Sequence, residues 1–358
     1  MKILALNPFH GGSHKAFLDN WISRSCHEWT LLTLPDTQWR WRLNFAAVEL
    51  SREIRQKHEE GERWDIIFTT SMLNVAELRG LCREIADIPL IAYFHENQLT
   101  YPENSNVKFN LSRSMKNINS ALAADKVWFN SEFHKNDFLS AARNLLEVKP
   151  GSPTDFVDEI EAKSSVQYLG IEDDFFFQRK LAITSPVKLV WASRWEEDKN
   201  PGLLFLALRS LKKHGVDFRM AVLGEEMKVR MKCFEDAKEE FSGEITQFGF
   251  AESREKYKEI LRKSDIFIST ADHEFFGIAA LEAAASGCIP VVPNHLAYPE
   301  VLKDFKQFFY KPRSSVGLVE KVISIIENQP QPDFSGIDRF RWSRISKVLD
   351  EAIRVTFI

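Results

Sequence analysis

Short apolar runs alternate with longer amphipathic stretches along the whole chain. In the first half, five runs have the length and the β-branched or aromatic content of strands: 3–6, 31–34, 65–70, 90–94 and 126–130. Apolar residues at helical spacing lie between them, most clearly over 44–58 and 112–124. Strands that alternate with helices predict a parallel sheet with crossover helices.

The second half repeats this pattern. Its predicted strands are 188–193, 218–224, 244–249, 265–270 and 288–293. Each half therefore predicts one Rossmann-like unit, in an α/β protein of two domains. We expect an N-terminal domain (1–172), a linker (173–186), a C-terminal domain (187–335) and a C-terminal helix (336–358). Apolar residues at helical spacing predict that this last helix packs back on the first domain.

Composition narrows the class of protein. The 358 residues are 44% hydrophobic, enough for two cores, and the formal charge of −4 gives no domain-wide basic signature. Any RNA contact must therefore come from a local patch. The four cysteines lie far apart without a CxxC pair, which suggests neither a disulfide framework nor a zinc site. No apolar stretch approaches the roughly 18 residues of a membrane span, so we expect a cytoplasmic protein.

Open α/β sheets bind ligands at the carboxyl ends of their strands, so we expect the functional residues in the loops there. The loop after the first strand reads NPFHGGSHK, in which Gly11 and Gly12 can let backbone N–H groups approach a phosphate. A tight turn that needs glycine explains the pair equally well. The loop lacks the GxGxxG pattern, and the second strand does not close on an acidic residue, which argues against a nicotinamide enzyme.

Three polar residues, His95, Glu96 and Asn97, follow the fourth strand in YFHENQ. A histidine there can donate to a sugar hydroxyl or a phosphate oxygen. A satisfied structural histidine is the alternative.

The loop ASRWEEDKNPG follows the first strand of the second half. Arg194 and Lys199 lie there, before a helix that Asn200-Pro201 would start. Two cations near a helix N-terminus suit a diphosphate. A solvated charge run is the alternative.

The stretch HEFFGIAALEAAASG carries two carboxylates eight positions apart. Glu274 is predicted in a loop and Glu282 in a helix over 278–286. The loop carboxylate can accept hydrogen bonds from sugar hydroxyls and the helix carboxylate from a ribose. Backbone N–H groups around Phe276 and Gly277 can meet phosphate or hydroxyl oxygens.

Together, these residues resemble retaining glycosyltransferases of the GT-B architecture, with two facing Rossmann-like domains and a donor cleft between them. The blocks NPFHGGSHKAFLDNW, TLPDTQWRWR, YFHENQLTYP, WASRWEEDKNP and STADHEFFGIAALEAAASGCIPVVPNHLAYPE further resemble the tRNA-queuosine α-mannosyltransferase family. The resemblance implies transfer of mannose from GDP-mannose to queuosine in tRNA-Asp, with retention. It implies no cofactor, no metal ion, no membrane and no obligate protein partner.

The resemblance and the residue patterns together predict roles for individual residues. The catalytic residues would be His95, Glu274, Arg194 and Lys199. The donor-binding residues would be Gly11, Gly12, Arg194, Lys199, Glu274, Phe275, Phe276, Gly277, Ile278 and Glu282. The acceptor or tRNA contacts would be His14, Trp39, Arg40, Trp41, Arg42, Glu96 and Asn97.

The segment TQWRWRLNFAAVELSREIRQKH (37–58) interleaves tryptophans with arginines. Arginines reach phosphates, and indoles stack on extruded bases. Core tryptophans covered by arginine side chains are the alternative.

Three function classes stay open on the sequence: a tRNA mannosyltransferase, a transferase of the same mechanism with a small glycan or lipid acceptor, and a non-catalytic protein that binds nucleotide sugars or RNA. A hydrolase that uses Glu274 and Glu282 fits less well, because a glycosidase needs no diphosphate cradle.

Overall fold

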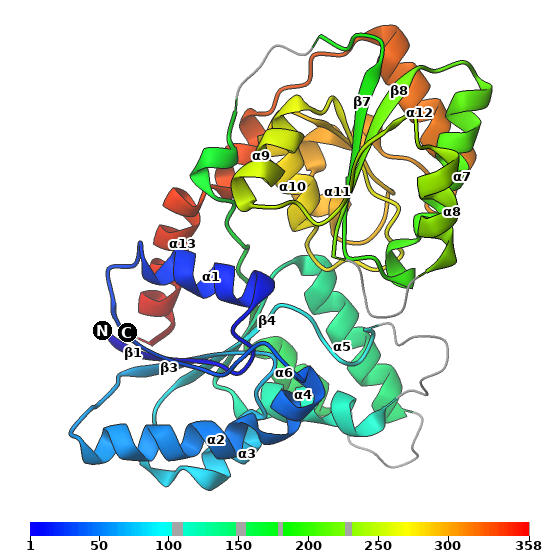
Figure 1. Cartoon of the computed structure of the whole chain (residues 1–358). Helices are drawn as coiled ribbons and strands as arrows, with labels where there is room; N and C mark the ends of the chain where they lie inside the picture. Colours follow the sequence, from blue (N-terminus) through cyan, green and yellow to red (C-terminus); the bar gives the residue numbers. More distant parts are fainter. Residues whose placement is uncertain (102–109, 148–154, 178–181, 226–230, 358) are drawn as a thin grey trace. The chain divides into compact units, whose positions relative to one another are not determined.

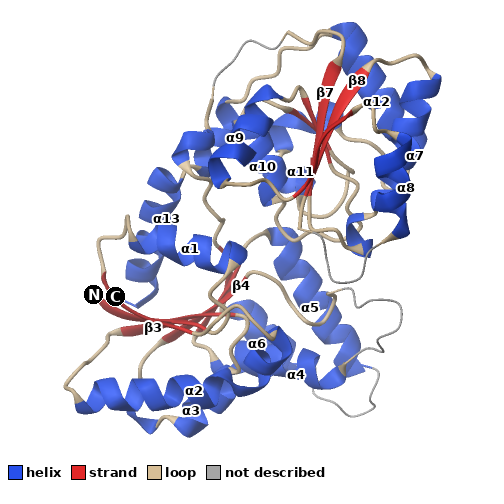
Figure 2. Cartoon of the chain, viewed as in Figure 1, coloured by secondary structure: helices blue, strands red, loops and turns tan. Residues whose placement is uncertain are grey.

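The structure is a computed structural model that describes residues 1–101, 110–147, 155–177, 182–225 and 231–357. The chain forms two compact units: unit 1 contains Met1–Gly170 and Trp342–Ile358, and unit 2 contains Ile171–Arg341. Each unit has one parallel sheet with helices on both faces (Figure 2), which confirms the predicted α/β class. Residues 178–181 of the predicted linker lie outside the described residues.

Unit 1 has a six-stranded parallel sheet in the order β2-β1-β3-β4-β5-β6. The strands are β1 (Lys2–Asn7), β2 (Glu28–Thr33), β3 (Ile66–Thr70), β4 (Leu90–Phe94), β5 (Lys126–Phe129) and β6 (Ser164–Val166). The helices are α1 (Gly12–Ile22), α2 (Trp39–Glu59), α3 (Val75–Leu81), α4 (Leu111–Ala123), α5 (Glu132–Glu147), α6 (Asp155–Ala162) and α13 (Trp342–Phe357).

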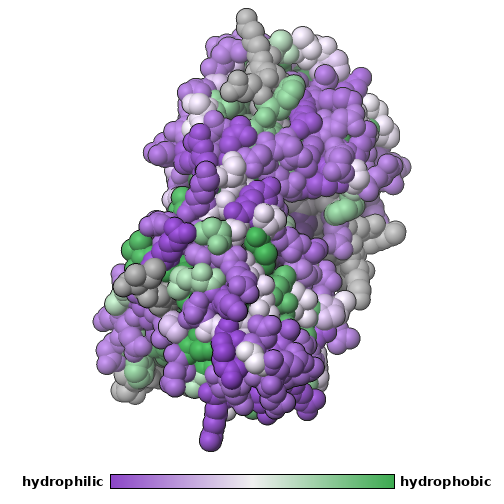
Figure 3. Space-filling view, turned by 90° about the vertical axis from the view of Figure 1, so that its left-hand side faces the viewer, coloured by the Kyte–Doolittle hydropathy of each residue, from purple (hydrophilic) through white to green (hydrophobic). Residues whose placement is uncertain are grey.

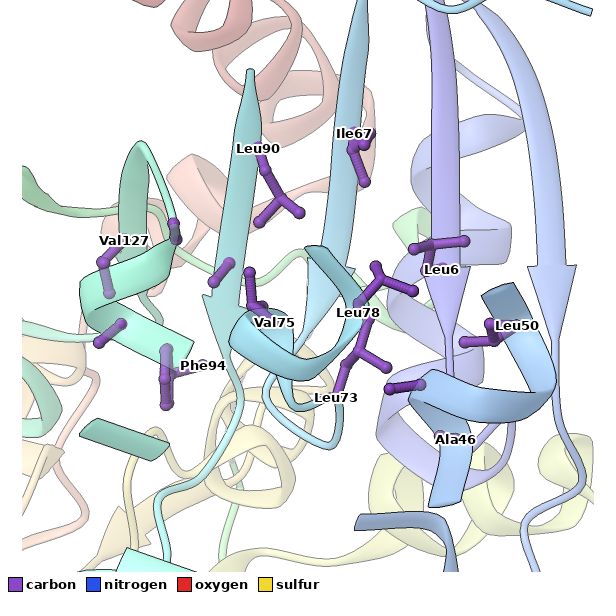
Figure 4. Close-up of a cluster of buried hydrophobic side chains, with 14 of the residues drawn as sticks. Leu6, Ala46, Leu50, Ile67, Leu73, Val75, Leu78, Leu90, Phe94 and Val127 are labelled. Atoms are coloured by element: carbon purple, nitrogen blue, oxygen red, sulfur yellow. The ribbon is translucent and has the colours of Figure 1, made fainter. Parts of the chain in front are cut away.

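The two faces of this sheet bury different kinds of side chain. Helices α1 and α13 lie on one face, and α2, α3, α4 and α6 lie on the other (Figure 1). The α2 side is mainly aliphatic, with Leu6, Leu50, Leu78 and Val127 in one cluster (Figure 4). On the α1 side, the ring of Phe17 packs on those of Tyr93 and Trp342, and the ring of Trp21 packs on that of Phe68.

A buried carboxylate joins the C-terminal helix to α1. Asp350 Oδ1 accepts hydrogen bonds from Trp21 Nε1 and Ser25 Oγ, and its Oδ2 accepts one from the backbone N–H of Cys26, all at 2.8 Å. Burial raises the pKa of Asp350, but these donors outweigh it and leave that pKa below the ordinary value. The last helix is therefore part of the core of unit 1.

Unit 2 has a five-stranded parallel sheet in the order β11-β10-β7-β8-β9. The strands are β7 (Val187–Ala192), β8 (Phe218–Leu223), β9 (Ile245–Gly249), β10 (Ile266–Ile268) and β11 (Ile289–Val291). The helices are α7 (Pro201–Lys213), α8 (Lys232–Glu240), α9 (Arg254–Lys263), α10 (Ile278–Ala285), α11 (Tyr298–Val301) and α12 (Ser315–Asn328). Strand β7 pairs with both β8 and β10, so the chain leaves it in one direction and returns on its other side. This is a topological switch point.

Differences from the sequence prediction lie mostly at the ends of elements. Strand β10 is shorter than predicted, and α2 begins at Trp39, not near residue 44. Strand β6 was not predicted; it is three residues long and begins with two serines. The face in Figure 3 is mainly hydrophilic, with scattered hydrophobic side chains. Within the described ranges, no helix combines the length and apolar character that a membrane crossing needs.

Candidate active site

The loops after β7 and β10 are tied together at the switch point of unit 2. The backbone N–H of Asp272 donates to Asp198 O at 2.8 Å, and Thr270 Oγ1 donates to Lys199 O at 2.7 Å. Asn200, which caps α7, donates through Nδ2 to Asp272 Oδ2 at 3.2 Å. These hydrogen bonds fix both loops at the place where an open α/β sheet binds its ligand.

Lys199 projects across this junction and is buried. Its Nζ donates to His273 O at 2.6 Å and lies 3.1 Å from Asp198 Oδ2 and 3.5 Å from Glu274 Oε2. The two predicted residues, Lys199 and Glu274, are therefore brought into one ion pair.

Each residue of this pair stabilises the charged form of the other. Burial alone would lower the pKa of Lys199, but Glu274 and Asp198 raise it above its ordinary value. Burial would likewise raise the pKa of Glu274, but Lys199 and two backbone N–H groups keep it below the ordinary value. Both groups are therefore charged near neutral pH.

Glu274 also organises the start of α10. Its Oε1 accepts from the backbone N–H groups of Gly277, at 3.1 Å, and Phe276, at 3.4 Å. These are the N–H groups that we predicted for ligand oxygens; here they hold Glu274. Gly277 has φ +86°, and a Cβ there would lie 2.7 Å from Tyr298 Cε1, so this position needs glycine.

Other predicted donor-binding residues lie beside Glu274. Phe275 and Phe276 are buried, and Phe276 packs edge-on against Phe340. Ile278, the first residue of α10, is partly exposed. The donor contacts predicted for these side chains stay predictions.

Arg194 lies on the loop after β7 and is less buried than Lys199. It is 49% exposed, and its guanidinium lies 3.2 Å from Glu196 Oε2. Its neighbour Trp195 anchors the loop by stacking on Phe234, with ring centroids 4.0 Å apart. Gly224 permits this approach, because a Cβ there would lie 2.7 Å from Trp195 Cδ1.

Glu282 is buried on α10 and held by residues of α9. Arg254 Nη2 forms an ion pair with Glu282 Oε1, and Tyr257 Oη donates to Glu282 Oε2 at 3.0 Å. Burial raises the pKa of Glu282 above its ordinary value, although Arg254 and Tyr257 oppose the shift. Each carboxylate oxygen has a second lone pair, so the predicted ribose contact stays a prediction.

The glycine pair of unit 1 follows β1. A Cβ on Gly11 would lie 2.1 Å from Asp36 Oδ2, so that side chain leaves room only for glycine. Gly12 has φ +50°, and no atom lies within 4 Å of a Cβ built on it. The backbone at Gly12, the first residue of α1, is therefore open to approach.

His95 and His14 are buried against each other, with ring centroids 4.3 Å apart. Neither ring nitrogen of His95, nor Nδ1 of His14, has a hydrogen-bond partner among the described residues. Burial lowers the pKa of His14 to about 4 and holds that of His95 well below its ordinary value. Both imidazoles are therefore neutral near pH 7, and His95 keeps its hydrogen-bonding capacity for a ligand.

Asn97 has a structural role that the sequence did not predict. Its Oδ1 accepts from the backbone N–H groups of Leu99 and Thr100, and its Nδ2 donates to Asp137 at 3.3 Å. The side chain is fully buried, so it shapes the loop after β4. Glu96 is partly exposed. The acceptor contacts predicted for both stay predictions.

The four residues Trp39–Arg42 form the first turn of α2. Trp39 is half-buried, whereas Arg40 and Trp41 are exposed. The guanidinium of Arg42 lies 2.7 Å from Glu49, and its side chain is only 13% exposed.

Sequence reasoning missed Asp198, Asp272, Arg254 and Tyr257. The position of Asp198 beside Lys199 was the one signal available.

One group of metal-binding residue types lies close together in the described ranges. Its ligand atoms, from Cys26, His27 and Asp350, lie within 4.8 Å of one another. The guanidinium of Arg354 lies 3.0 Å from Cys26 Sγ, and Asp350 already accepts three hydrogen bonds. We assign no metal to this group.

Two family models match the chain. Residues 2–171 match the tRNA-queuosine alpha-mannosyltransferase N-terminal model, and residues 172–336 match the glycosyl transferases group 1 model. The tRNA-queuosine alpha-mannosyltransferase of Drosophila melanogaster is 37% identical over 310 residues, which cover 84% of this chain and 81% of that protein. The GDP-mannose:cellobiosyl-diphosphopolyprenol alpha-mannosyltransferase of Xanthomonas oryzae is 20% identical over 180 residues, 48% of this chain and 47% of that protein.

The fold is that of GT-B glycosyltransferases. Sucrose-phosphate synthase from Thermosynechococcus elongatus superposes with a TM-score of 0.74 at 12% identity, over 100% of this chain and 99% of that chain. From the family models and the Drosophila relative, the chain is a glycosyltransferase and belongs to the tRNA-queuosine alpha-mannosyltransferase family.

Proposed function

We propose that this enzyme transfers mannose from GDP-mannose to queuosine in the anticodon loop of tRNA-Asp, with retention and without a metal ion. Family membership supports mannosyl transfer to queuosine. The name of the Xanthomonas relative supports GDP-mannose as the donor. A reaction on tRNA also supports a cytoplasmic location.

The observation that carries the proposal is the Lys199–Glu274 pair at the switch point of unit 2. The ammonium of Lys199 has three N–H donors, and its longest contact is the one to Glu274. A phosphate oxygen of the donor can replace that contact, which leaves Glu274 Oε2 to accept from a mannose hydroxyl. Oε1 stays fixed by the backbone N–H groups of Phe276 and Gly277.

The remaining residues would bind and orient the donor. Arg194, half exposed on the same loop, adds positive charge for the diphosphate, and Glu282 accepts from the ribose. His95 contacts the sugar or its phosphate as a neutral imidazole, and the open backbone at Gly12 admits the phosphates. Cations and helix N-termini then stabilise the leaving group in the role that a divalent ion has elsewhere.

The proposed transfer of mannose needs no nucleophile from the enzyme. The bond between mannose C1 and the β-phosphate oxygen breaks, and a hydroxyl oxygen of the queuosine cyclopentene ring bonds to C1 on the same face. The hydroxyl proton passes to the departing GDP. Lys199 and Arg194 stabilise the negative charge that develops on the diphosphate.

The test is incubation of the purified protein with GDP-mannose and queuosine-containing tRNA, followed by mass spectrometry of the nucleosides. A hexose on queuosine is expected, with tRNA that lacks queuosine as the control. Separate reactions contain UDP-glucose in place of GDP-mannose, or other queuosine-containing tRNAs in place of tRNA-Asp. A further reaction contains EDTA to remove metal ions. GDP release without a hexose on RNA would point to a different acceptor. Donor binding without turnover would contradict the proposed transferase activity.

A further inference from the structure

Two aromatic side chains of unit 1 are exposed next to each other on α2. Trp41 is 50% exposed and Phe45 is 37% exposed. Their ring centroids lie 4.8 Å apart, at an interplanar angle of 33°. Residues four apart share one face of a helix, and the same face continues to Arg52, which is exposed. The first half of α2 therefore carries an apolar platform followed by a cation.

Cations also lie at the starts of α2 and α4. The guanidinium groups of Arg40, on α2, and Arg113, on α4, lie 5.3 and 5.4 Å from the ring centroid of Trp39. Lys116 of α4 donates to Asn44 Oδ1 at 2.5 Å. The starts of the two helices are therefore in contact through these side chains.

Arg40 occupies an unfavourable place in the free protein. It lies in the first turn of α2, and that turn contains no acidic residue. The helix dipole disfavours cations at an N-terminus. An anionic ligand would offset this cost, which explains the charge pattern better than helix stability does.

Topology places this surface at the ligand-binding edge of the sheet. Helix α2 is the first helix after β2, and α4 is the first described helix after β4. Helices that follow parallel strands begin at the carboxyl-end edge, where ligands bind. His95, directly after β4, lies at the same edge of unit 1.

We propose that the exposed face of α2 binds single-stranded RNA, with Trp41 and Phe45 stacking on one unpaired base and Arg40 and Arg52 contacting phosphates beside it. The inference rests on the proposed function, which supplies an RNA acceptor, and adds where its anticodon loop docks. Stacking needs an exposed ring face, and backbone contact needs cations. Arg42, buried against Glu49, serves as a structural residue of the helix.

The test measures the affinity of the full-length protein for two RNAs: the queuosine-containing anticodon stem-loop of tRNA-Asp and a fully paired duplex of equal length. The double variant W41A/F45A should weaken stem-loop binding about 5- to 100-fold, the range that loss of one stacked base gives, and leave duplex binding unchanged. Trp41→Phe should retain most of the affinity. R40A/R52A should reduce the slope of log affinity against log salt by about 1 to 2.

Two exposed residues elsewhere on unit 1 provide matched controls. Phe156 is 43% exposed on α6, and Arg24 is exposed after α1. Phe156→Ala and Arg24→Ala should bind RNA like the wild type. Thermal unfolding verifies that each variant is folded.

The outcomes separate the two proposals. If the wild type adds no hexose to queuosine, the proposed function fails. If the wild type does so but W41A/F45A binds the stem-loop within about twofold of wild type, only the platform is wrong. An equal loss on the duplex, or for Phe156→Ala, also contradicts the platform, and the exposed rings would then fit a protein partner.

Discussion

The ammonium of Lys199 lies 3.5 Å from the carboxylate of Glu274, and the two come from loops that follow adjacent strands of unit 2. Both side chains carry their charge near neutral pH because each shifts the pKa of the other. The pair is therefore charged before any donor arrives.

Replacing Lys199 should affect transfer most. Lys199→Met should lower kcat/KM about 100- to 1,000-fold, the range found when one charge-stabilising donor is removed. Glu274→Gln, which keeps an oxygen for the N–H groups of Phe276 and Gly277, should lower kcat more than it lowers the melting temperature. Arg194→Ala should cost ~2 to 4 kcal/mol of transition-state stabilisation. A kcat/KM within about threefold of wild type would contradict each assignment.

Arg254 should position Glu282 for the ribose. Arg254→Ala leaves a buried carboxyl without its cation, which should cost ~3 to 5 kcal/mol of stability and favour protonation. The preference for GDP over 2′-deoxy-GDP should shrink, whereas Arg254→Lys should keep part of it. Lys263→Ala, at an exposed site on the same helix, is the control. An unchanged ribose preference in Arg254→Ala would show that Glu282 does not act through this pair.

His14 should make unit 1 sensitive to acid. Burial lowers the pKa of its imidazole from the ordinary 6.5 to about 4 in the folded state. Between these values the unfolded chain binds more protons, so stability is retained above pH 6.5 and is lost as the pH falls toward 4. The contribution is about 3 kcal/mol. His14→Gln should flatten this part of the stability curve, measured by urea unfolding; an unchanged slope would refute the assignment.

Asp350 should matter for stability alone. Asp350→Asn loses the acceptor for the backbone N–H of Cys26 and should destabilise unit 1 by ~1 to 3 kcal/mol. The neighbouring Glu351→Gln, at an exposed site, should change stability little. Differential scanning calorimetry makes the comparison, and equal melting temperatures for the two variants would contradict a buried anchor.

The variant Gly12→Ala tests whether the donor phosphates approach the backbone at Gly12. Gly12→Ala places a Cβ in open space at φ +50°, which costs ~1 kcal/mol of backbone strain. Gly61→Ala introduces the same kind of strain at φ +97°, again in open space, at the end of α2. If phosphates approach Gly12, its variant should raise the KM for GDP-mannose several-fold more than the Gly61 variant. Equal KM values would make Gly12 a turn residue only.

Most of the fold follows from local patterns, because each long buried strand reads as an apolar run bounded by turn residues. Strand β6 could not be predicted in this way, because Ser164 and Ser165 are not apolar and pair with β5 through backbone atoms. The start of α2 was not predicted because Arg40 and Trp41 are exposed and Trp39 is only half-buried, so no buried stripe marks the first turn.

The site was predictable only in part. Lys199 and Glu274 were found because both follow buried strands, and the strand order makes those strands neighbours. Arg254 and Tyr257 could not be found, because their partner Glu282 lies on another helix and no spacing rule links the two. Arg42 was misassigned for another reason. Its place among aromatic residues suggested RNA, but it pairs with Glu49, seven residues along the same face of α2.

The return of α13 to unit 1 sets an order for synthesis on the ribosome. Unit 2 is one continuous segment, Ile171–Arg341, inserted between the two parts of unit 1. Translation therefore delivers every residue of unit 2 before Trp342 appears. The face of the nascent N-terminal sheet that α13 covers therefore stays open to water until unit 2 and then α13 have been synthesised. The need for chaperones should accordingly last until α13 has emerged.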